Sequence, residues 1–210
     1  MARVVCLLVL ACLAALPFLA QDEAGPVFGD TVVSTSALQG KVYPIKRGTK
    51  HLPKFEKLRP AGSIYTTSLN VRPRSFRDGF PGVTKRQEWF AIEYTGKFWI
   101  EQASTYRFGM LSDDGSRLWI DDEMIVDLDG LHPPLGAAAS VVLSRGSHRM
   151  RVQYYQGPGY EVALVLAVAT PDRPFKIFQT DDFLPPRDPA GWIEGTISNI
   201  DRPQQPWIPK

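Results

Sequence analysis

The feature that most constrains the fold is a series of short apolar or alternating runs, separated by turn residues, between about residues 63 and 182. Turn residues such as those at 129–130, 145–146 and 156–159 separate the runs. Runs of this length and spacing indicate β-strands, and this many of them predict an all-β protein, an antiparallel β-sandwich or barrel. The eight runs are residues 89–92, 97–100, 105–111, 117–120, 124–126, 140–143, 148–155 and 162–169.

Two of the runs show which faces should be buried. Residues 148–154 alternate polar and apolar side chains, which predicts a strand with one face on the core and the other in water. Residues 162–169 are almost entirely apolar, which predicts a strand buried on both faces. Pro171 should end that strand because proline lacks a backbone donor and has a fixed φ.

The N-terminus has the pattern of an export signal. Arg3 precedes an uncharged, leucine-rich stretch that ends near Ala20, so we expect residues 1–20 to be a cleaved signal peptide. An uncleaved anchor is less well supported, because the stretch is short for a membrane span and contains Pro17. Cleavage would remove both cysteines, Cys6 and Cys12, and leave a mature chain without thiols or disulfides.

The rest of the chain is expected to flank a single domain. Residues 21–62 are rich in glycine, proline and lysine, which is typical of an irregular lead segment. Residues 63–182 should form the β domain, and residues 183–210 read as a proline-rich tail. The 24 Lys and Arg residues are scattered among 22 Asp and Glu residues, so the basic stripe of a nucleic-acid binder is missing. We therefore expect no nucleic-acid partner and no membrane span in the mature form.

The densest polar cluster lies between Ser112 and Gly130, where seven carboxylates occupy nineteen positions. They fall at strand ends and turns, where their oxygens can converge on a hard cation such as Ca²⁺. Turn chemistry is the alternative, because Asp-Gly pairs and aspartate side chains commonly stabilise turns. The adjacent pair Asp113-Asp114 is unusual for a turn, because like charges repel unless a cation or several backbone donors compensate them. Both interpretations stay open on these residues alone.

Residues 105–121, Thr-Tyr-Arg-Phe-Gly-Met-Leu-Ser-Asp-Asp-Gly-Ser-Arg-Leu-Trp-Ile-Asp, resemble the signature of the anthrax protective-antigen fourteen-kilodalton domain family. The resemblance extends through residues 124–130, the turn at 146–148 leading into 151–155, and the strand 162–169. It covers roughly residues 63–182. The family fold is a barrel-like β-sandwich, and its members occur in adhesins, toxins, glycosidases and other secreted proteins.

The resemblance also implies a site. In fungal adhesins of the family, two successive aspartates joined by a cis peptide hold Ca²⁺, and the ion coordinates sugar hydroxyls. Asp113 and Asp114 match those positions, and Gln156 stands where the adhesins carry an asparagine. The resemblance thus implies Asp113, Asp114 and Gln156 as metal ligands. Tyr160 could stack on a sugar ring or simply start the next strand.

Other polar and aromatic residues are predicted to be structural. Asp121 and Asp122 match the family's hairpin turn, and aspartate tolerates positive φ better than most residues. Trp119 should face the core or a sheet surface. The aromatic residues at 89–90 and 98–99 read first as packing, although a solvent-facing member of that group could serve as a sugar platform.

These observations predict a secreted, non-catalytic carbohydrate-binding or adhesion module whose partner is a glycan or polysaccharide, in a periplasmic, cell-envelope or extracellular setting. The alternative is a structural or protein-interaction domain that binds envelope or extracellular proteins without sugar. An enzyme is disfavoured. The chain lacks a Gly-x-Ser-x-Gly motif and a glycine-rich phosphate loop, and its three histidines form no short metal-ligand motif.

Overall fold

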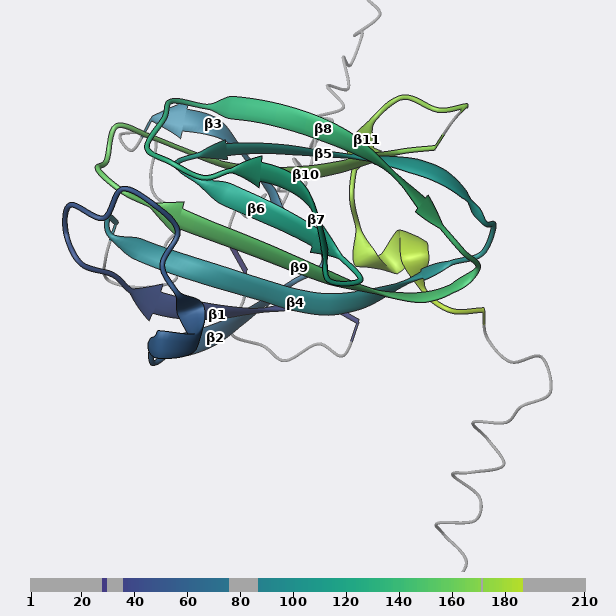
Figure 1. The fold of residues 1–210 in the computed structure, drawn as a ribbon, viewed down its shortest axis with the longest axis horizontal. Helices are drawn as coiled ribbons and strands as arrows, with labels where there is room; N and C mark the ends of the chain where they lie inside the picture. The colour runs from purple at the N-terminus through teal and green to yellow at the C-terminus, as the bar shows by residue number, and fades with distance from the viewer. Residues whose placement is uncertain (1–27, 30–35, 76–86, 171, 187–210) are drawn as a thin grey trace, which may run out of the picture.

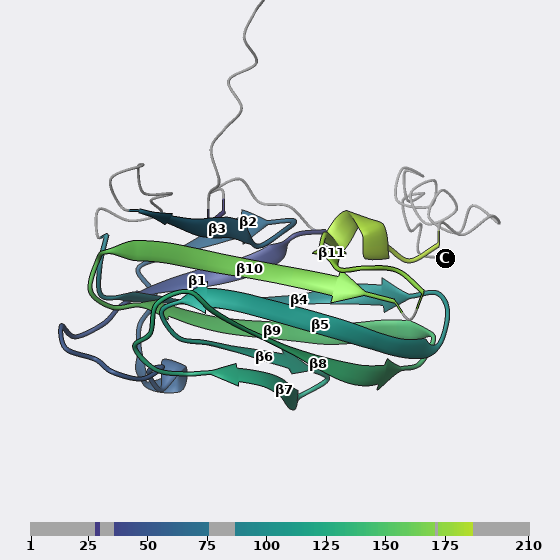
Figure 2. The same cartoon turned by 90° about the horizontal axis from the view of Figure 1, so that it is seen from above.

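The computed structural model describes residues 28–29, 36–75, 87–170 and 172–186. The strands of both its sheets run along the same long axis in two perpendicular views (Figures 1 and 2). Every strand pair in the described residues is antiparallel. The predicted all-β antiparallel fold is therefore confirmed. The predicted signal peptide, residues 1–20, and residues 187–210 of the predicted tail lie outside the described part of the chain.

One sheet has six strands in the order β2-β1-β4-β9-β6-β7. Its strands are β1 (Leu38–Pro44), β2 (Gly62–Thr66), β4 (Phe90–Ile100), β6 (Ser116–Ile120), β7 (Glu123–Leu128) and β9 (Gly146–Gln156). The other sheet has the order β11-β10-β5-β8, with β3 also paired to β10. Its strands are β3 (Asn70–Ser75), β5 (Ser104–Asp113), β8 (Leu135–Leu143), β10 (Glu161–Ala169) and β11 (Lys176–Ile177).

The eight predicted runs correspond to seven strands, because the runs 89–92 and 97–100 join in the long strand β4. The residues between them keep the inside-outside alternation. Tyr94 is buried in the core, whereas Thr95 and Lys97 are exposed. Gly96 lies against Leu38 of β1, where an added Cβ would come within 2.5 Å of the leucine side chain. The Leu38 side chain fills the space that a side chain at position 96 would need, and this packing, not a turn, explains the glycine.

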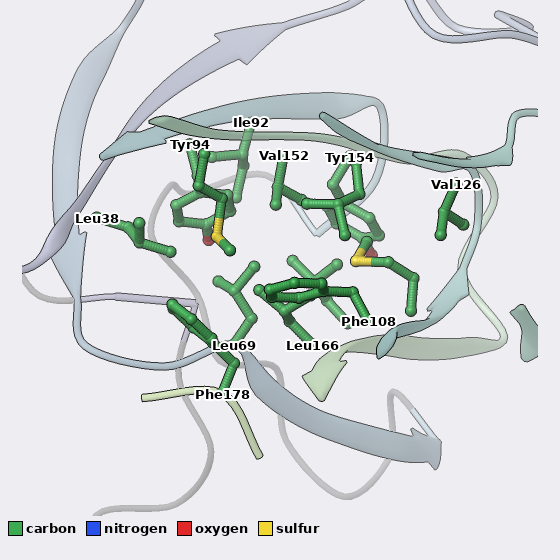
Figure 3. Close-up of a cluster of buried hydrophobic side chains, with 14 of the residues drawn as sticks. Leu38, Leu69, Ile92, Tyr94, Phe108, Val126, Val152, Tyr154, Leu166 and Phe178 are labelled. Atoms are coloured by element: carbon green, nitrogen blue, oxygen red, sulfur yellow. The ribbon is translucent and has the colours of Figure 1, made fainter. Parts of the chain in front are cut away.

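The core lies between the two sheets. Figure 3 shows Tyr94, Val152 and Tyr154 from the six-stranded sheet facing Phe108 and Leu166 from the other. All five have exposed fractions of 0%. The alternation predicted for residues 148–154 is confirmed on the core side, and β10 is buried along most of its length, as its apolar sequence predicts.

Part of the predicted lead segment is built into the domain. Residues 38–44 form β1, which lies between β2 and β4. The connection from β1 to β2 contains the 3-10 helix η1 (Phe55–Lys57) and packs on the outer face of the sheet. There Phe55 contacts Tyr43 edge-on, with ring centroids 5.2 Å apart, in a small second cluster that includes Tyr155. The backbone N–H of Leu52 in the same connection donates to Asp129 Oδ1 at 2.6 Å.

The domain also extends slightly past its predicted end. After β11 the 3-10 helix η3 (Thr180–Phe183) places Phe183 in parallel stacking on Phe178, with ring centroids 5.0 Å apart. Phe183 also meets Phe98 edge-on. Within the described residues, no helix is long and apolar enough to cross a membrane.

Candidate site in the Asp113–Asp114 loop

Two short connections bring the candidate residues to one end of the sandwich. Strand β5 ends at Asp113, and β6 begins at Ser116. Strand β9 ends at Gln156, and β10 begins at Glu161. The arrowheads of β5 and β9 point toward the same end in Figure 1. The connection between β7 and β8 joins them there, because the backbone N–H of His132 donates to Asp114 Oδ1 at 3.2 Å.

Asp114 is held by donors from two loops. Besides the N–H of His132, the N–H of Gly157 donates to Asp114 Oδ2 at 2.7 Å. The residue is 4% exposed. Burial raises the pKa of Asp114, while its bonds from Gly157 and His132 counteract that rise. The two N–H groups therefore orient this carboxylate and partly compensate its charge.

Asp113 is in a different situation although it is the adjacent residue and only 6% exposed. Within the described residues, no donor makes a hydrogen bond to its carboxylate. Burial and the neighbouring carboxylates of Asp114 and Glu161 raise its pKa from the ordinary 3.8 to about 7. The peptide bond between Asp113 and Asp114 is cis. The carboxylate of Asp113 is therefore buried beside those of Asp114 and Glu161, and no hydrogen bond from the described residues stabilises its charged form.

Gln156 reaches the same place from β9 and is fully buried. Its Nε2 lies 3.4 Å from Asp114 Oδ2 and 3.2 Å from the backbone oxygen of Glu161. Its Oε1 lies 2.5 Å from the hydroxyl of Tyr154, and that hydroxyl is also 2.7 Å from the backbone oxygen of Asp113. The structure thus brings Asp113, Asp114 and Gln156 together, as the resemblance implies.

Tyr160 occupies the loop that follows Gln156 and is 82% exposed. The same loop is attached to the site by Gly157, where an added Cβ would meet Asp114 Oδ2 at 3.0 Å and Leu131 at 2.6 Å. The backbone N–H of Gly159 donates to Glu88 Oε1 at 2.7 Å. An exposed ring therefore lies in a loop whose first residue touches the acidic pair.

Sequence reasoning missed four contributors to the site: His132, Tyr154, Gly157 and Glu161. The N–H groups of His132 and Gly157 have no side-chain signature, so composition could not reveal them. The sequence predicts that Tyr154 lies in a strand, but the contact of its hydroxyl with Asp113 depends on how β9 packs against the end of β5. Glu161 could have been noticed, because it is an acid next to the loop that contains Gln156.

The remaining acids of the cluster serve the sheet. Asp121 and Asp122 have positive φ angles of 49° and 71°, which confirms their prediction as hairpin residues. Asp121 accepts bonds from His148 Nδ1 and from the N–H of Arg149. Asp127 is paired with Arg117 at 3.0 Å. No group of three or more acidic or histidine side chains in the described residues is arranged to hold a metal, so any ion at Asp113 would need further oxygen ligands.

The architecture and the site together define an antiparallel β-sandwich domain that carries an acidic loop site at one end. The model of the PA14 domain family matches residues 74–179, half of the chain. The chain belongs to the PA14 domain family.

Three further proteins are similar to the chain. Anti-sigma-I factor RsgI3 of Acetivibrio thermocellus is 26% identical over 80 residues, which are 38% of this chain and 12% of that protein. A solved anti-sigma factor domain-containing protein superposes with a TM-score of 0.58 at 19% identity, over 75% of this chain and 50% of that one. A PA14 sugar-binding domain from an RTX adhesin also gives 0.58, at 17% identity, over 70% of this chain and 97% of that domain. At these identities the structural matches establish the fold.

Proposed function

We propose that the chain is a non-catalytic carbohydrate-binding domain that acts outside the cytoplasm and binds its glycan at the Asp113–Asp114 loop. The observation that carries the proposal is the pairing of a buried, donor-poor carboxylate at Asp113 with one held by backbone N–H groups at Asp114. The solved PA14 sugar-binding domain that shares the fold supports the same assignment. Export through residues 1–20 is part of the proposal.

The residues fit a Ca²⁺ ion. Calcium prefers carboxylate, carbonyl and water oxygens. Asp113 and Asp114 supply two buried carboxylates, and a cation would offset both the burial and the repulsion from Asp114 and Glu161 that raise the pKa of Asp113. Because the described residues contain no third acidic or histidine ligand arranged for a metal, the remaining coordination would fall to amide oxygens, water or sugar hydroxyls. When bound, the ion would supply positive charge to which sugar hydroxyls can coordinate.

Hydrogen-bond accounting at Tyr154 supports Gln156 as a ligand. A phenol carries one proton, so its hydroxyl cannot donate both to the backbone oxygen of Asp113 and to Gln156 Oε1. If the carboxamide turned over, its NH₂ would donate to the Tyr154 oxygen and its carbonyl oxygen would face Asp114. That orientation places oxygens against each other and is favourable only with a cation present. Ion binding and amide orientation are therefore coupled in this proposal.

The exposed ring of Tyr160 supplies the second element of sugar recognition. Aromatic faces pack against the apolar faces of sugar rings, while hydroxyls take polar partners. With 82% of Tyr160 exposed, its ring is available to a ligand that also reaches the acidic pair. The Tyr160 side chain would increase the affinity for the sugar, and this contribution would not depend on Ca²⁺.

The experiment is calorimetric titration of Ca²⁺ into the metal-stripped protein, followed by a glycan array with and without the ion. We expect Ca²⁺ uptake and ion-dependent binding of at least one glycan, both lost in Asp113→Asn. Asp181→Asn is the matched control, because Asp181 is an exposed aspartate in η3. Glycan binding that persists in EDTA would reject the calcium role and keep the sugar role.

A protein-interaction domain is the second candidate function. The observation that favours it is the similarity to two anti-sigma factor proteins, of which the chain spans only 12% and 50%. If a folded sample shows neither Ca²⁺ uptake nor glycan binding, this candidate replaces the first. Pull-down with envelope proteins, compared between the native chain and Asp113→Asn, would then test whether the same loop makes the contact.

A further inference from the structure

A groove lies on the outer face of the six-stranded sheet, separate from the residues that hold Asp113 and Asp114. It has a volume of about 370 Å³ and crosses four neighbouring strands, β1, β4, β9 and β6. Met150 at its base belongs to the core cluster, whereas the side chains of its neighbours Arg149 and Arg151 point to the opposite face. The groove is therefore formed by the outward-facing side chains of the sheet.

Strand register places a row of polar and aromatic side chains across the groove. Gln39 pairs with Thr95, Thr95 with Arg151, and Arg151 with Trp119. Trp119 in turn lies opposite Met124 at the sheet edge, where Met124 is 48% exposed. Paired residues on one face lie close enough to contact a single ligand together. The row thus offers a carboxamide, a hydroxyl, a guanidinium and an indole.

Arg151 and Trp119 form one recognition unit. The guanidinium carbon of Arg151 lies 4.2 Å from the centroid of the Trp119 ring. Stacking on an aromatic ring fixes the plane of a guanidinium, which leaves its N–H edge free to bind a carboxylate with two hydrogen bonds. Among the described residues, no carboxylate is paired with Arg151.

The charge of the groove is positive. Lys97 and Arg149 lie opposite each other on β4 and β9, one row away from Arg151. The lining contains these three cations and a single carboxylate, Asp122, which is already paired with Arg149. Lys97 and Arg151 have no ion-pair partner within the part of the chain that the structure describes. The positive charge of this groove therefore favours an anionic ligand.

The position of the groove's strands within the sheet favours an acidic sugar over an acidic peptide as its ligand. A peptide that binds to a sheet gains much of its affinity from the free backbone groups of an edge strand. Strands β1, β4, β9 and β6 are all interior strands, paired on both sides. The groove therefore offers side chains alone. Its hydroxyl, carboxamide and indole suit sugar hydroxyls and ring faces, and its cations suit carboxylates repeated along a chain.

We propose that this groove is a second binding site, for an acidic polysaccharide that carries uronate carboxylates. Arg151, stacked on Trp119, binds one carboxylate. Lys97 adds charge, and Thr95 and Gln39 bond to hydroxyls. The site needs no metal, and it stands independently of the Asp113–Asp114 loop.

The test measures binding of the protein, in EDTA, to polygalacturonate, with dextran as a neutral sugar, and with polyglutamate and single-stranded DNA as other polyanions. We expect polygalacturonate to bind with an affinity that falls as salt rises. Loss of one charge-assisted contact in Lys97→Gln or Arg151→Gln should weaken binding about tenfold or more. Lys41→Gln, an exposed lysine of β1 outside the groove, should change it less than about twofold. Asp113→Asn should leave it unchanged.

Four outcomes overturn the proposal. They are no binding of polygalacturonate, equal binding of dextran, equal binding of polyglutamate or DNA, and an effect of Lys41→Gln as large as that of Lys97→Gln. Lys97 is exposed, so its replacement tests the groove without threatening the fold. Loss of calcium-dependent glycan binding in Asp113→Asn, with polygalacturonate binding retained, would show that the two sites are separate.

Discussion

The hydroxyl of Tyr154 lies 2.7 Å from the backbone oxygen of Asp113. This contact joins the end of β9 in one sheet to the end of β5 in the other. The tyrosine is fully buried, and its ring packs against Phe28 and Phe90. One side chain thus serves the hydrophobic core and positions the acidic loop.

Replacement of Tyr154 by phenylalanine tests this connection. It keeps the ring but removes the hydroxyl proton, so one of the two buried oxygens beside it, on Asp113 or Gln156, loses its donor. We expect a loss of about 1–3 kcal/mol in the free energy of unfolding. Urea denaturation measures it. Tyr160→Phe is the control, since its exposed hydroxyl should contribute almost nothing. Equal stability of the two variants would show that the hydroxyl of Tyr154 is not needed.

The raised pKa of Asp113 predicts a pH dependence of the metal-free domain. The folded state holds a proton to about pH 7, whereas the unfolded chain releases it near the ordinary 3.8. The stabilising contribution of the protonated group is therefore complete below the unfolded pKa and is lost as pH rises toward about 7. Asp113→Asn should be little altered at about pH 4 and more stable than the native chain at about pH 8. Thermal unfolding of both proteins in EDTA at the two pH values measures this. A difference in melting temperature between the variant and the native chain that is the same at both pH values would contradict the prediction.

Gly115 is required by close packing in the acidic loop. An added Cβ would lie 2.5 Å from Tyr155 Cε1 and 2.9 Å from the backbone nitrogen of Gly130. Because backbone cannot move aside cheaply, Gly115→Ala should destabilise the domain by about 1–3 kcal/mol and weaken Ca²⁺ binding. Gly62→Ala is the matched control, since an added Cβ there meets nothing within 4 Å. Thermal unfolding distinguishes the two, and similar melting temperatures would refute the packing argument.

The packing of the β1–β2 connection predicts that residues before 62 belong to the folding unit. Phe55 is 5% exposed and packs on Tyr43 in the outer cluster. Phe55→Ala should cost about 3 kcal/mol, the usual loss for a buried phenylalanine. Lys57→Ala, an exposed neighbour in η1, should cost little. The measurement is guanidinium unfolding, and a small effect at Phe55 would mean that the connection is dispensable.

Much of the fold could be predicted because strand patterning is local. The alternation of residues 148–154 identifies a strand with one face on the core, and the apolar run 162–169 identifies a strand that is buried along most of its length. The hairpin at Asp121 and Asp122 was likewise predictable, because tolerance of positive φ is a property of the residue itself. The position of residues 38–44 in the sheet could not be predicted. This glycine-containing segment is recognisable as a strand only from its pairing with β4.

The sequence by itself determined the class of fold, the seven strands β4 to β10, and the pair Asp113-Asp114 as the candidate site. The tertiary structure alone decided which groups surround that pair. The N–H groups of His132 and Gly157 and the hydroxyl of Tyr154 arrive from segments distant in the chain. The groove of Arg151 and Trp119 likewise depends on the register of separate strands. Strand patterns depend on residues that are neighbours along the chain. Sites depend on residues that are neighbours in space, and the packing of the two sheets determines which residues those are.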